Sequence, residues 1–454
     1  MTRAVSMTQG PMVPILLRVA LPITGANLLQ SAYQLVNTLF VGHLGAAEVA
    51  AVAASGPLFE LLISLGSGLS TAGAVLMAQH AGAGNRTELG RIAGQTLLLV
   101  GFVALCFMTI GQIFAPQVLH ALGVEPAIAD ISISYLRIRY CAMVPMFGFI
   151  AIQAMLNAAG EVRYTMTVTA CSVALNAALD PWLIFGIGSW QGLGVRGAAL
   201  ATITAQSLAL CIGMFHLLRG RSMVRLRAAD FRPQLPHLRQ HAALGLPSSI
   251  EQGVRTFGSL VLMSLAAGFG THALATYGLG TRLLFFWFSP MLGLSVATAV
   301  VVGQNLGAGQ DQRAVAAVRT ASLLAMGAFT AIGLALLPLV PWIMHALTPG
   351  EPQLIHDASV FAYIYCPFLG LLALPQVLNG AFRGAGSTRL AMALSLAMVW
   401  LFQVPSGVLL AFVVGIGVTG LWWSYPIGNT LAALLCLAWF VWGRWRRNLV
   451  TGAR

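Results

Sequence analysis

The amino-acid sequence repeats itself over most of its length. The segment Gly73–Asn85 (GAVLMAQHAGAGN) returns as Thr298–Gln310 (TAVVVGQNLGAGQ). Further pairs follow in the same order: Pro22 with Pro247, Gly45 with Gly270, Leu156–Arg163 with Phe382–Arg389, and Gly194–Gly197 with Gly417–Gly420. Internal duplication of this extent in an apolar chain is the usual construction of secondary transporters. The repeat therefore predicts two similar bundles of helices that face a central cleft.

The composition places these bundles in a membrane. Hydrophobic residues make up 58% of the chain and charged residues only 8%, with a mean hydropathy of +0.84, whereas soluble domains carry about 25% charged residues. Apolar stretches long enough to cross ~30 Å of hydrocarbon follow one another, and we count about twelve. The expected spans are 19–40, 49–77, 94–115, 131–157, 164–187, 197–218, 242–267, 271–302, 321–344, 358–382, 390–414 and 420–442.

The positive charges are distributed unevenly between the breaks that separate the spans. All 24 are arginines. Those in the even-numbered breaks include Arg86, Arg91, Arg163, Arg313, Arg319, Arg383, Arg389 and the arginines of the polar stretch Arg219–His241, whereas the odd breaks hold only Arg196. By the positive-inside rule, the even breaks and both termini are cytoplasmic. The net charge of +12 then reflects topology and anionic lipid, and no nucleic-acid partner is expected.

The polar stretch falls where the two copies meet, which predicts the domain organisation. We expect an N-lobe at 1–220, a basic cytoplasmic linker at 221–240 and a C-lobe at 241–454. Six crossings per copy make the repeats parallel, related by a pseudo-two-fold axis along the membrane normal. The six cysteines lie within spans without CxxC or Cys/His spacing, so we predict neither a metal site nor a catalytic residue.

Asp180 is the deepest of three acids that fall inside predicted spans. Asn176 stands four residues earlier on the same helix face and can hydrogen-bond its carboxyl group. Pro181 follows and cannot donate a backbone hydrogen bond, so we expect a hinge there. A carboxyl group held away from water beside a hinge is a candidate site for binding and releasing a coupling ion. The alternative is a structural acid that bonds only Asn176 and the backbone groups freed by the proline.

The other two acids have competing interpretations. Glu251 stands four residues before Arg255 on one helix face, so it forms either an internal ion pair or a cation or substrate site. Glu60 lies in the interior of the second span, and its position alone argues for function.

The first span is unusually polar for a helix in lipid. Its polar residues include Gln30, Tyr33, Gln34 and Asn37. We predict that this face lines a cavity, and the alternative is hydrogen bonding between helices.

Several of these motifs together resemble the multidrug and toxic compound extrusion (MATE) family over essentially the whole chain. They are Val36–Gly45, the paired Gln-x-x-Gly-Ala-Gly turns, Asn176–Gly186 and Phe382–Arg389. The resemblance implies an all-α integral membrane fold of twelve transmembrane helices in two six-helix lobes. It also implies export of cationic or amphipathic compounds in exchange for protons or sodium ions.

The resemblance carries over to individual residues. Asn176 and Asp180 resemble the amino-lobe cation site of the prokaryotic DNA-damage-inducible-type (DinF-like) branch. That branch commonly has an aspartate where this chain has Asn37, which cannot titrate. Glu251 resembles the seventh-helix glutamate of the bacterial drug–sodium exchange branch, whose tenth-helix aspartate has no counterpart in Leu371–Gln376. The resemblance thus assigns cation coupling to Asp180, with Asn176 and Asn37 beside it.

The sequence therefore predicts a secondary active multidrug efflux transporter of the bacterial inner membrane. Expected partners are small organic cations or amphipathic drugs and membrane lipid, and the protein is expected to act as a monomer without a cofactor other than the coupling ion, H+ or Na+. One alternative is a lipid-linked precursor flippase of the same superfamily, with Arg255 and Arg282 as phosphate ligands. A membrane-embedded enzyme is a second alternative, but the nine histidines show no HxxxD or HExxH spacing.

Overall fold

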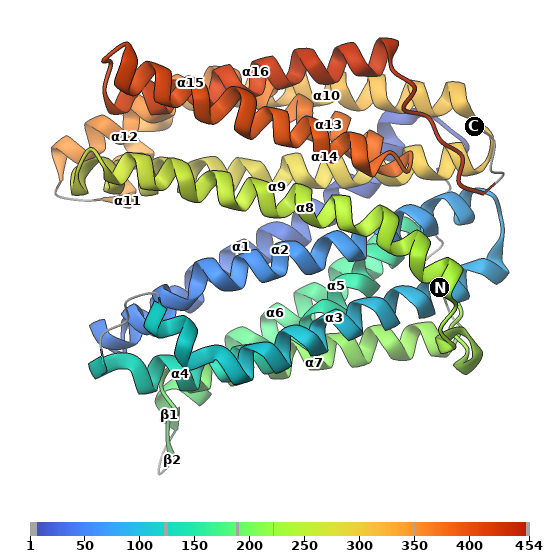
Figure 1. Ribbon diagram of the computed structural model, residues 1–454, viewed down its shortest axis with the longest axis horizontal. Helices are drawn as coiled ribbons and strands as arrows, with labels where there is room; N and C mark the ends of the chain where they lie inside the picture. The colour runs from blue at the N-terminus through green and yellow to red at the C-terminus, as the bar shows by residue number, and fades with distance from the viewer. Residues whose placement is uncertain (1–6, 122–125, 188–189, 221, 349–350, 451–454) are drawn as a thin grey trace. The chain divides into compact units, whose positions relative to one another are not determined.

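The computed structural model describes residues 7–121, 126–187, 190–220, 222–348 and 351–450, and most of them are helical (Figure 1). The first half of the chain forms α1 (Met12–Gly42), α2 (Ala46–Gly82), α3 (Arg86–Ala121), α4 (Pro126–Cys141), α5 (Met143–Ala158), α6 (Val162–Phe185) and α7 (Val195–Leu218). A short antiparallel ribbon of β1 (Gly186–Ile187) and β2 (Trp190–Gln191) connects α6 to α7.

The second half begins with the 3-10 turn η1 (Ala228–Phe231) and continues mainly as helices. These are α8 (Leu235–Ala267), α9 (Thr271–Gly307), α10 (Asp311–Leu336), α11 (Val340–Leu347), α12 (Pro352–Tyr365), α13 (Leu369–Gly384), α14 (Thr388–Leu396), α15 (Val404–Val408) and α16 (Val418–Trp442). The 3-10 turns η2 (Leu337–Leu339) and η3 (Cys366–Phe368) and the π-helical segments η4 (Ala397–Gln403) and η5 (Leu409–Val413) join some of them.

The predicted all-α membrane architecture is confirmed. Within the described residues, 11 helical stretches are long and apolar enough to cross a membrane. The remaining expected crossing corresponds to α8, which carries His237, Arg239, Glu251 and Arg255 and is therefore less hydropathic.

Four predicted spans are interrupted rather than continuous. The span 390–414 passes through the π-helical segments η4 and η5, and in the other three a proline lies at or near the break. The span 131–157 breaks at Ala142, just before Pro145 in the first turn of α5. The spans 321–344 and 358–382 pass through η2 and η3, which contain Pro338 and Pro367. Proline lacks the backbone N–H that an uninterrupted α-helix needs, so these are helices with local breaks.

The backbone confirms the internal duplication. α2 and α9 both contain 37 residues, and each begins directly after a glycine with positive φ. Glycines aligned by the repeat share this conformation, which residues with a Cβ rarely adopt: Gly45 with Gly270, Gly84 with Gly309, and Gly194 with Gly417. The repeated glycines thus fix the same turns in both copies.

The chain divides into two compact units. One consists mainly of Gly25–Ser249, and the other combines Ile250–Arg454 with Ser6–Thr24. The division falls inside α1 and α8, shortly after the aligned prolines Pro22 and Pro247. The first helix of each copy therefore belongs partly to each unit.

The polar stretch between the copies packs onto the first unit. The Gln95 side-chain amide of α3 donates hydrogen bonds to the carbonyl oxygens of Asp230 (2.9 Å) and Arg232 (2.8 Å), and its oxygen accepts one from the Gln234 backbone N–H (3.0 Å). Arg221, inside the predicted linker, lies outside the described residues. The chain passes from the first unit to the second only after this polar stretch, at Ser249 and Ile250 within α8.

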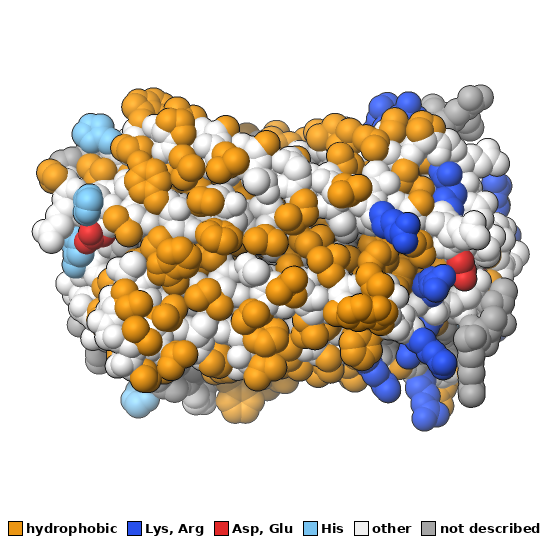
Figure 2. Space-filling model, turned by 90° about the horizontal axis from the view of Figure 1, so that it is seen from above, with side chains coloured by type: hydrophobic (Ala, Val, Ile, Leu, Met, Phe, Trp, Pro, Cys, Tyr) orange, Lys and Arg blue, Asp and Glu red, His pale blue; other side chains and the backbone are white. Residues whose placement is uncertain are grey.

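Charged side chains are distributed unevenly along the helices. In the face drawn in Figure 2, arginine side chains gather toward one end and histidine side chains toward the other, and an acidic side chain is visible at each end. This asymmetry agrees with the pattern from which the sequence predicts a cytoplasmic side.

Close packing of α13 against α9 requires glycine. A Cβ built at Gly384 would collide with the Ala299 carbonyl oxygen, and one built at Gly380 would collide with that of Ser295. Gly327, inside α10, has nothing within 4 Å of such a Cβ. Glycine thus has a packing role at the first two positions and not at the third.

We expect Gly384→Ala to lower the stability of the protein by about 1–3 kcal/mol, because the added methyl group forces backbone apart. The matched variant Gly327→Ala should leave stability unchanged or raise it by up to ~1 kcal/mol, since alanine favours helix. Thermal unfolding midpoints of the detergent-solubilised protein measure both. Equal effects at the two positions would contradict the packing interpretation.

Candidate functional site

Asp180 is fully buried in α6 of the first unit. The Tyr33 hydroxyl of α1 donates a hydrogen bond of 2.7 Å to its Oδ2 atom. The other carboxyl oxygen, Oδ1, has no hydrogen-bond partner among the described residues. Within that part of the chain, no ion pair neutralises this acid.

The faces of α1 and α6 that carry these residues lie against each other. Besides the contact between Tyr33 and Asp180, Val41 packs in one apolar cluster with Ile184, and the rings of Phe40 and Phe185 lie 6.3 Å apart. One helical turn after Tyr33, Asn37 is on the same side of α1, and Asn176 precedes Asp180 by one turn on α6. The structure thus brings the three predicted coupling residues to one pair of helix faces.

Each of the three residues has one unsatisfied side-chain oxygen. The side-chain Oδ1 atoms of Asn37, Asn176 and Asp180 are buried, and none has a hydrogen-bond partner in the described residues. The sequence predicted Asn176 as the partner of Asp180, whereas the structure gives that role to Tyr33. A buried oxygen acceptor without a donor costs about 1–3 kcal/mol. Because hard cations are bound by oxygen ligands, this set is suited to a cation.

Pro181 lies inside α6, which continues to Phe185 and is followed by Gly186, a residue with positive φ. Its missing N–H removes the backbone hydrogen bond that would reach the Ala177 carbonyl. The predicted hinge therefore corresponds to a helix position with a weakened backbone, directly beside Asp180.

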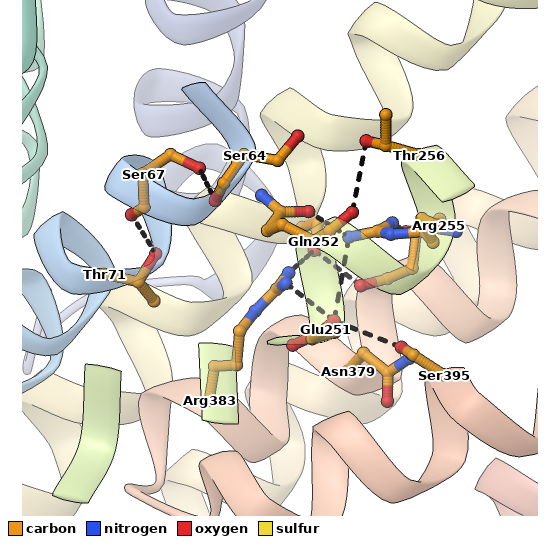
Figure 3. A network of polar contacts seen from close by, with 12 residues as sticks. Ser64, Ser67, Thr71, Glu251, Gln252, Arg255, Thr256, Asn379, Arg383 and Ser395 are labelled. Carbon is orange, nitrogen blue, oxygen red and sulfur yellow. Dashed lines mark hydrogen bonds and ion pairs between the residues drawn. The ribbon is translucent and has the colours of Figure 1, made fainter. Parts of the chain in front are cut away.

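Glu251 has a different environment in the second unit (Figure 3). It is fully buried, and its Oε1 atom accepts hydrogen bonds from Arg383 Nη1 (3.0 Å) and Ser395 Oγ (3.2 Å). Arg255 Nη2 lies 3.6 Å from the same oxygen. Glu251 is therefore paired with two guanidinium groups through one oxygen, whereas its other oxygen, Oε2, has no hydrogen-bond partner among the described residues. The two positive charges beside the carboxylate disfavour a cation at this site.

The sequence identified Arg255 from its spacing but missed Arg383. Arg383 was predicted in a cytoplasmic break, and the structure places it as the penultimate residue of α13, where it is buried in the protein with a relative exposure of 8%. One signal was available, because the repeat aligns Arg383 with Asn157, and Asn157 is also buried and hydrogen-bonded, to Thr165. A buried polar residue at both aligned positions indicates an interior site.

The remaining candidates lie closer to the surface. The side chains of Glu60, Gln30 and Gln34 are exposed. Arg139 interacts electrostatically with Glu60, and its guanidinium lies over the Phe59 ring at 3.9 Å from the centroid. Thus Arg139 has an acidic and an aromatic neighbour.

One hollow of the first unit lies apart from these residues. A cavity of about 540 Å³ is lined by Tyr164, Cys211, Ile212, Phe215, His216 and Arg219 of α6 and α7 and the residue after α7. Tyr164 and Asp180 are roughly 24 Å apart along α6 at 1.5 Å per residue, so this cavity is not part of the site around Asp180.

Comparison with known proteins relates the whole chain to one group of transporters. A family model described as MatE matches residues 22–182 and 247–409, more than half of the chain. The chain is 30% identical to a probable multidrug resistance protein NorM from Deinococcus radiodurans, with 94% of each chain covered. It is 26% identical to the protein of the same name from Thermotoga maritima, covering 96% of this chain and 93% of that protein.

The fold is similar to that of solved transporters. The structure of a MOP superfamily transporter from Pyrococcus furiosus superimposes with a TM-score of 0.90 at 23% sequence identity, covering 98% of this chain and 97% of that one. At this level of identity the likeness establishes the fold.

Proposed function

The chain belongs to the multidrug and toxic compound extrusion (MATE) family, and we propose that it exports amphipathic compounds in exchange for a cation bound at Asp180. Its relatives are transporters rather than enzymes, and its many apolar helices make it a multi-pass membrane protein. The coupling ion is H+ or Na+. Binding and release of that ion at Asp180 switches the protein between inward-open and outward-open states.

One observation carries this proposal: Asp180 is a fully buried carboxyl group that, among the described residues, receives a single hydrogen bond, from Tyr33, and keeps one unpartnered oxygen. A buried acid kept without a positive partner is costly in a membrane. Glu251 also has one unpartnered oxygen but lies beside two guanidinium groups, whereas Asp180 has no positive partner among the described residues. The incomplete shell of Asp180 is what a site needs if it fills and empties in each transport cycle.

The substrate class follows the relatives, which are named as probable multidrug resistance proteins. We propose export of several amphipathic and cationic drugs across the bacterial inner membrane, with both termini cytoplasmic. A single chain contains both repeats, and we propose that it works as a monomer.

We expect substrate-dependent ion movement from the purified protein in liposomes. Rhodamine 123 is added to vesicles that contain a pH-sensitive or sodium-sensitive dye, at fixed pH, with either sodium or choline as the external cation. Proton coupling predicts a pH change in both media, because proton exchange does not require sodium. Sodium coupling predicts a sodium signal, and loss of dye transport when choline replaces sodium.

Protein-free liposomes give the background for this measurement. If rhodamine 123 crosses the membrane in a protein-dependent way but moves neither ion, the proposed exchange mechanism is wrong.

A further inference from the structure

The buried charges around Glu251 do not balance. We call Glu251, Gln252, Arg255, Gln376 and Arg383 the Glu251 cluster (Figure 3). It contains one carboxylate and two guanidinium groups, and the side chain of Arg255 is only 16% exposed. One positive charge is therefore in excess in the membrane-spanning part of the second unit, where an unbalanced charge costs several kcal/mol.

No other acid of the Ile250–Arg454 segment is available to balance this charge. Asp311 begins α10 and is exposed, and Glu351 immediately precedes α12 and is also exposed. Asp357 is paired with His272, with 2.7 Å between Oδ2 and Nε2. All three therefore lie outside the Glu251 cluster.

The hydrogen bonds show which guanidinium group carries the excess positive charge. Arg383 donates to Glu251 Oε1 (3.0 Å) and to Ser295 Oγ (3.1 Å), and so pairs directly with the carboxylate. Arg255 is 3.6 Å from Glu251 and donates instead to neutral amide oxygens, those of Gln376 (2.6 Å) and Gln252 (2.7 Å). The charge of Arg255 is therefore the one without a carboxylate of its own.

The amide oxygens beside Arg255 are already used by its guanidinium group, so the amide groups that remain there are donors. A guanidinium group only donates, so both glutamine oxygens must face it, and their –NH2 groups remain as further donors. The Arg255 guanidinium also lies 6.0 Å from the centroid of the Phe288 ring. A site rich in donors, with one excess positive charge and an aromatic ring, is complementary to an aromatic anion.

We propose that Arg255 binds the carboxylate of an exported aromatic compound, so that carboxylate-bearing amphipathic molecules are substrates. The inference rests on the proposed export function and specifies its substrate class. The excess of one positive charge matches a single carboxylate. A lipid-linked diphosphate would bring more negative charge than the cluster neutralises, so the flippase alternative fits this site less well.

Equilibrium binding tests the inference without any ion gradient. Rhodamine 110 has a free carboxylate, and rhodamine 123 is its methyl ester, so the two dyes share one aromatic system and differ at the group in question. Fluorescence anisotropy with the purified wild-type protein in detergent should show tighter binding of rhodamine 110. Arg255→Gln should lower the affinity for rhodamine 110 by about tenfold or more, since a charge-assisted hydrogen bond is lost. The affinity for rhodamine 123 should stay nearly unchanged.

Two further variants separate recognition from folding. Arg255→Lys keeps the charge and should restore part of the rhodamine 110 affinity. Arg319→Gln removes an exposed arginine of α10 and should leave both affinities unchanged, which controls for the net charge of the chain. Equal wild-type affinities for the two dyes, or an equal loss of both in Arg255→Gln, would overturn the inference.

Transport distinguishes this inference from the proposed function. In liposomes with an imposed gradient, Asp180→Asn should stop efflux of both dyes, whereas Arg255→Gln should stop only that of rhodamine 110. If Asp180→Asn transports normally but the binding difference at Arg255 persists, the coupling proposal fails and the carboxylate site stands. If the binding difference is absent while Asp180→Asn is inactive, the carboxylate site at Arg255 fails and the coupling proposal stands.

Discussion

Replacing Asp180 with asparagine is expected to reduce gradient-driven efflux of rhodamine 123 to the rate of protein-free vesicles. The amide has nearly the same shape as the carboxyl group and can still accept the hydrogen bond from the Tyr33 hydroxyl, which is 2.7 Å long in the native protein. It cannot take up a proton or hold a cation by charge. Coupling should therefore be lost even though the local packing of α1 and α6 is kept.

The folded state should tolerate this change. An uncharged amide in a buried position avoids the cost of an unpaired carboxylate, so the thermal unfolding midpoint should be equal to or higher than that of the wild type. Asp311→Asn makes the same chemical change at an exposed position of α10 and should transport normally. Undiminished gradient-driven efflux by a well-folded Asp180→Asn protein would reject Asp180 as the coupling residue.

Removing Arg383 is expected to cost about 3–5 kcal/mol of stability, because it breaks a buried ion pair and leaves a charge behind. Glu251 is fully buried, and its remaining positive neighbour, Arg255, is 3.6 Å away and bonded to two glutamines. Arg383→Ala also removes the donor to Ser295, which ties α13 to α9. The thermal midpoint in detergent and the yield of monodisperse protein should both fall.

A double substitution tests the physical cause. Arg383→Met combined with Glu251→Gln removes both charges of the pair and should recover much of the lost stability, because no close unpaired carboxylate remains. Arg389→Ala, at an exposed position of α14, provides the matched control and should change stability little. If Arg383→Ala is no less stable than Arg389→Ala, the pair has no role in holding the second unit together.

The sequence predicted the membrane architecture well because lipid imposes simple rules on it. A spanning segment must satisfy its backbone hydrogen bonds internally, so long apolar stretches predict helices, and the repeat predicts two copies. Prolines 145, 338 and 367 lie at or next to the breaks within predicted spans, but their effect depends on local backbone conformation. The sequence therefore predicted the helices better than their interruptions.

The site was predicted only in part. Asp180 stood out because an acid in an apolar stretch is unusual. Its partner Tyr33 is 147 residues away, and neither segment alone predicts that α1 packs against α6. Arg383 was placed in a polar break between spans, because hydropathy treats every arginine alike, and its burial at the end of α13 was not predicted. Its burial depends on Glu251, which lies 132 residues away.

The division of α1 and α8 between the two compact units has a mechanical consequence. A flexible tether lets two bodies reorient independently, whereas a continuous helix shared by both transmits torque. Any change in orientation of the units must bend or twist α1 and α8 near Pro22 and Pro247. Tyr33 lies on α1 in the same unit as Asp180, whereas the start of α1 belongs to the other unit. Under the proposed function, ion binding at Asp180 would therefore act on a helix that both units share.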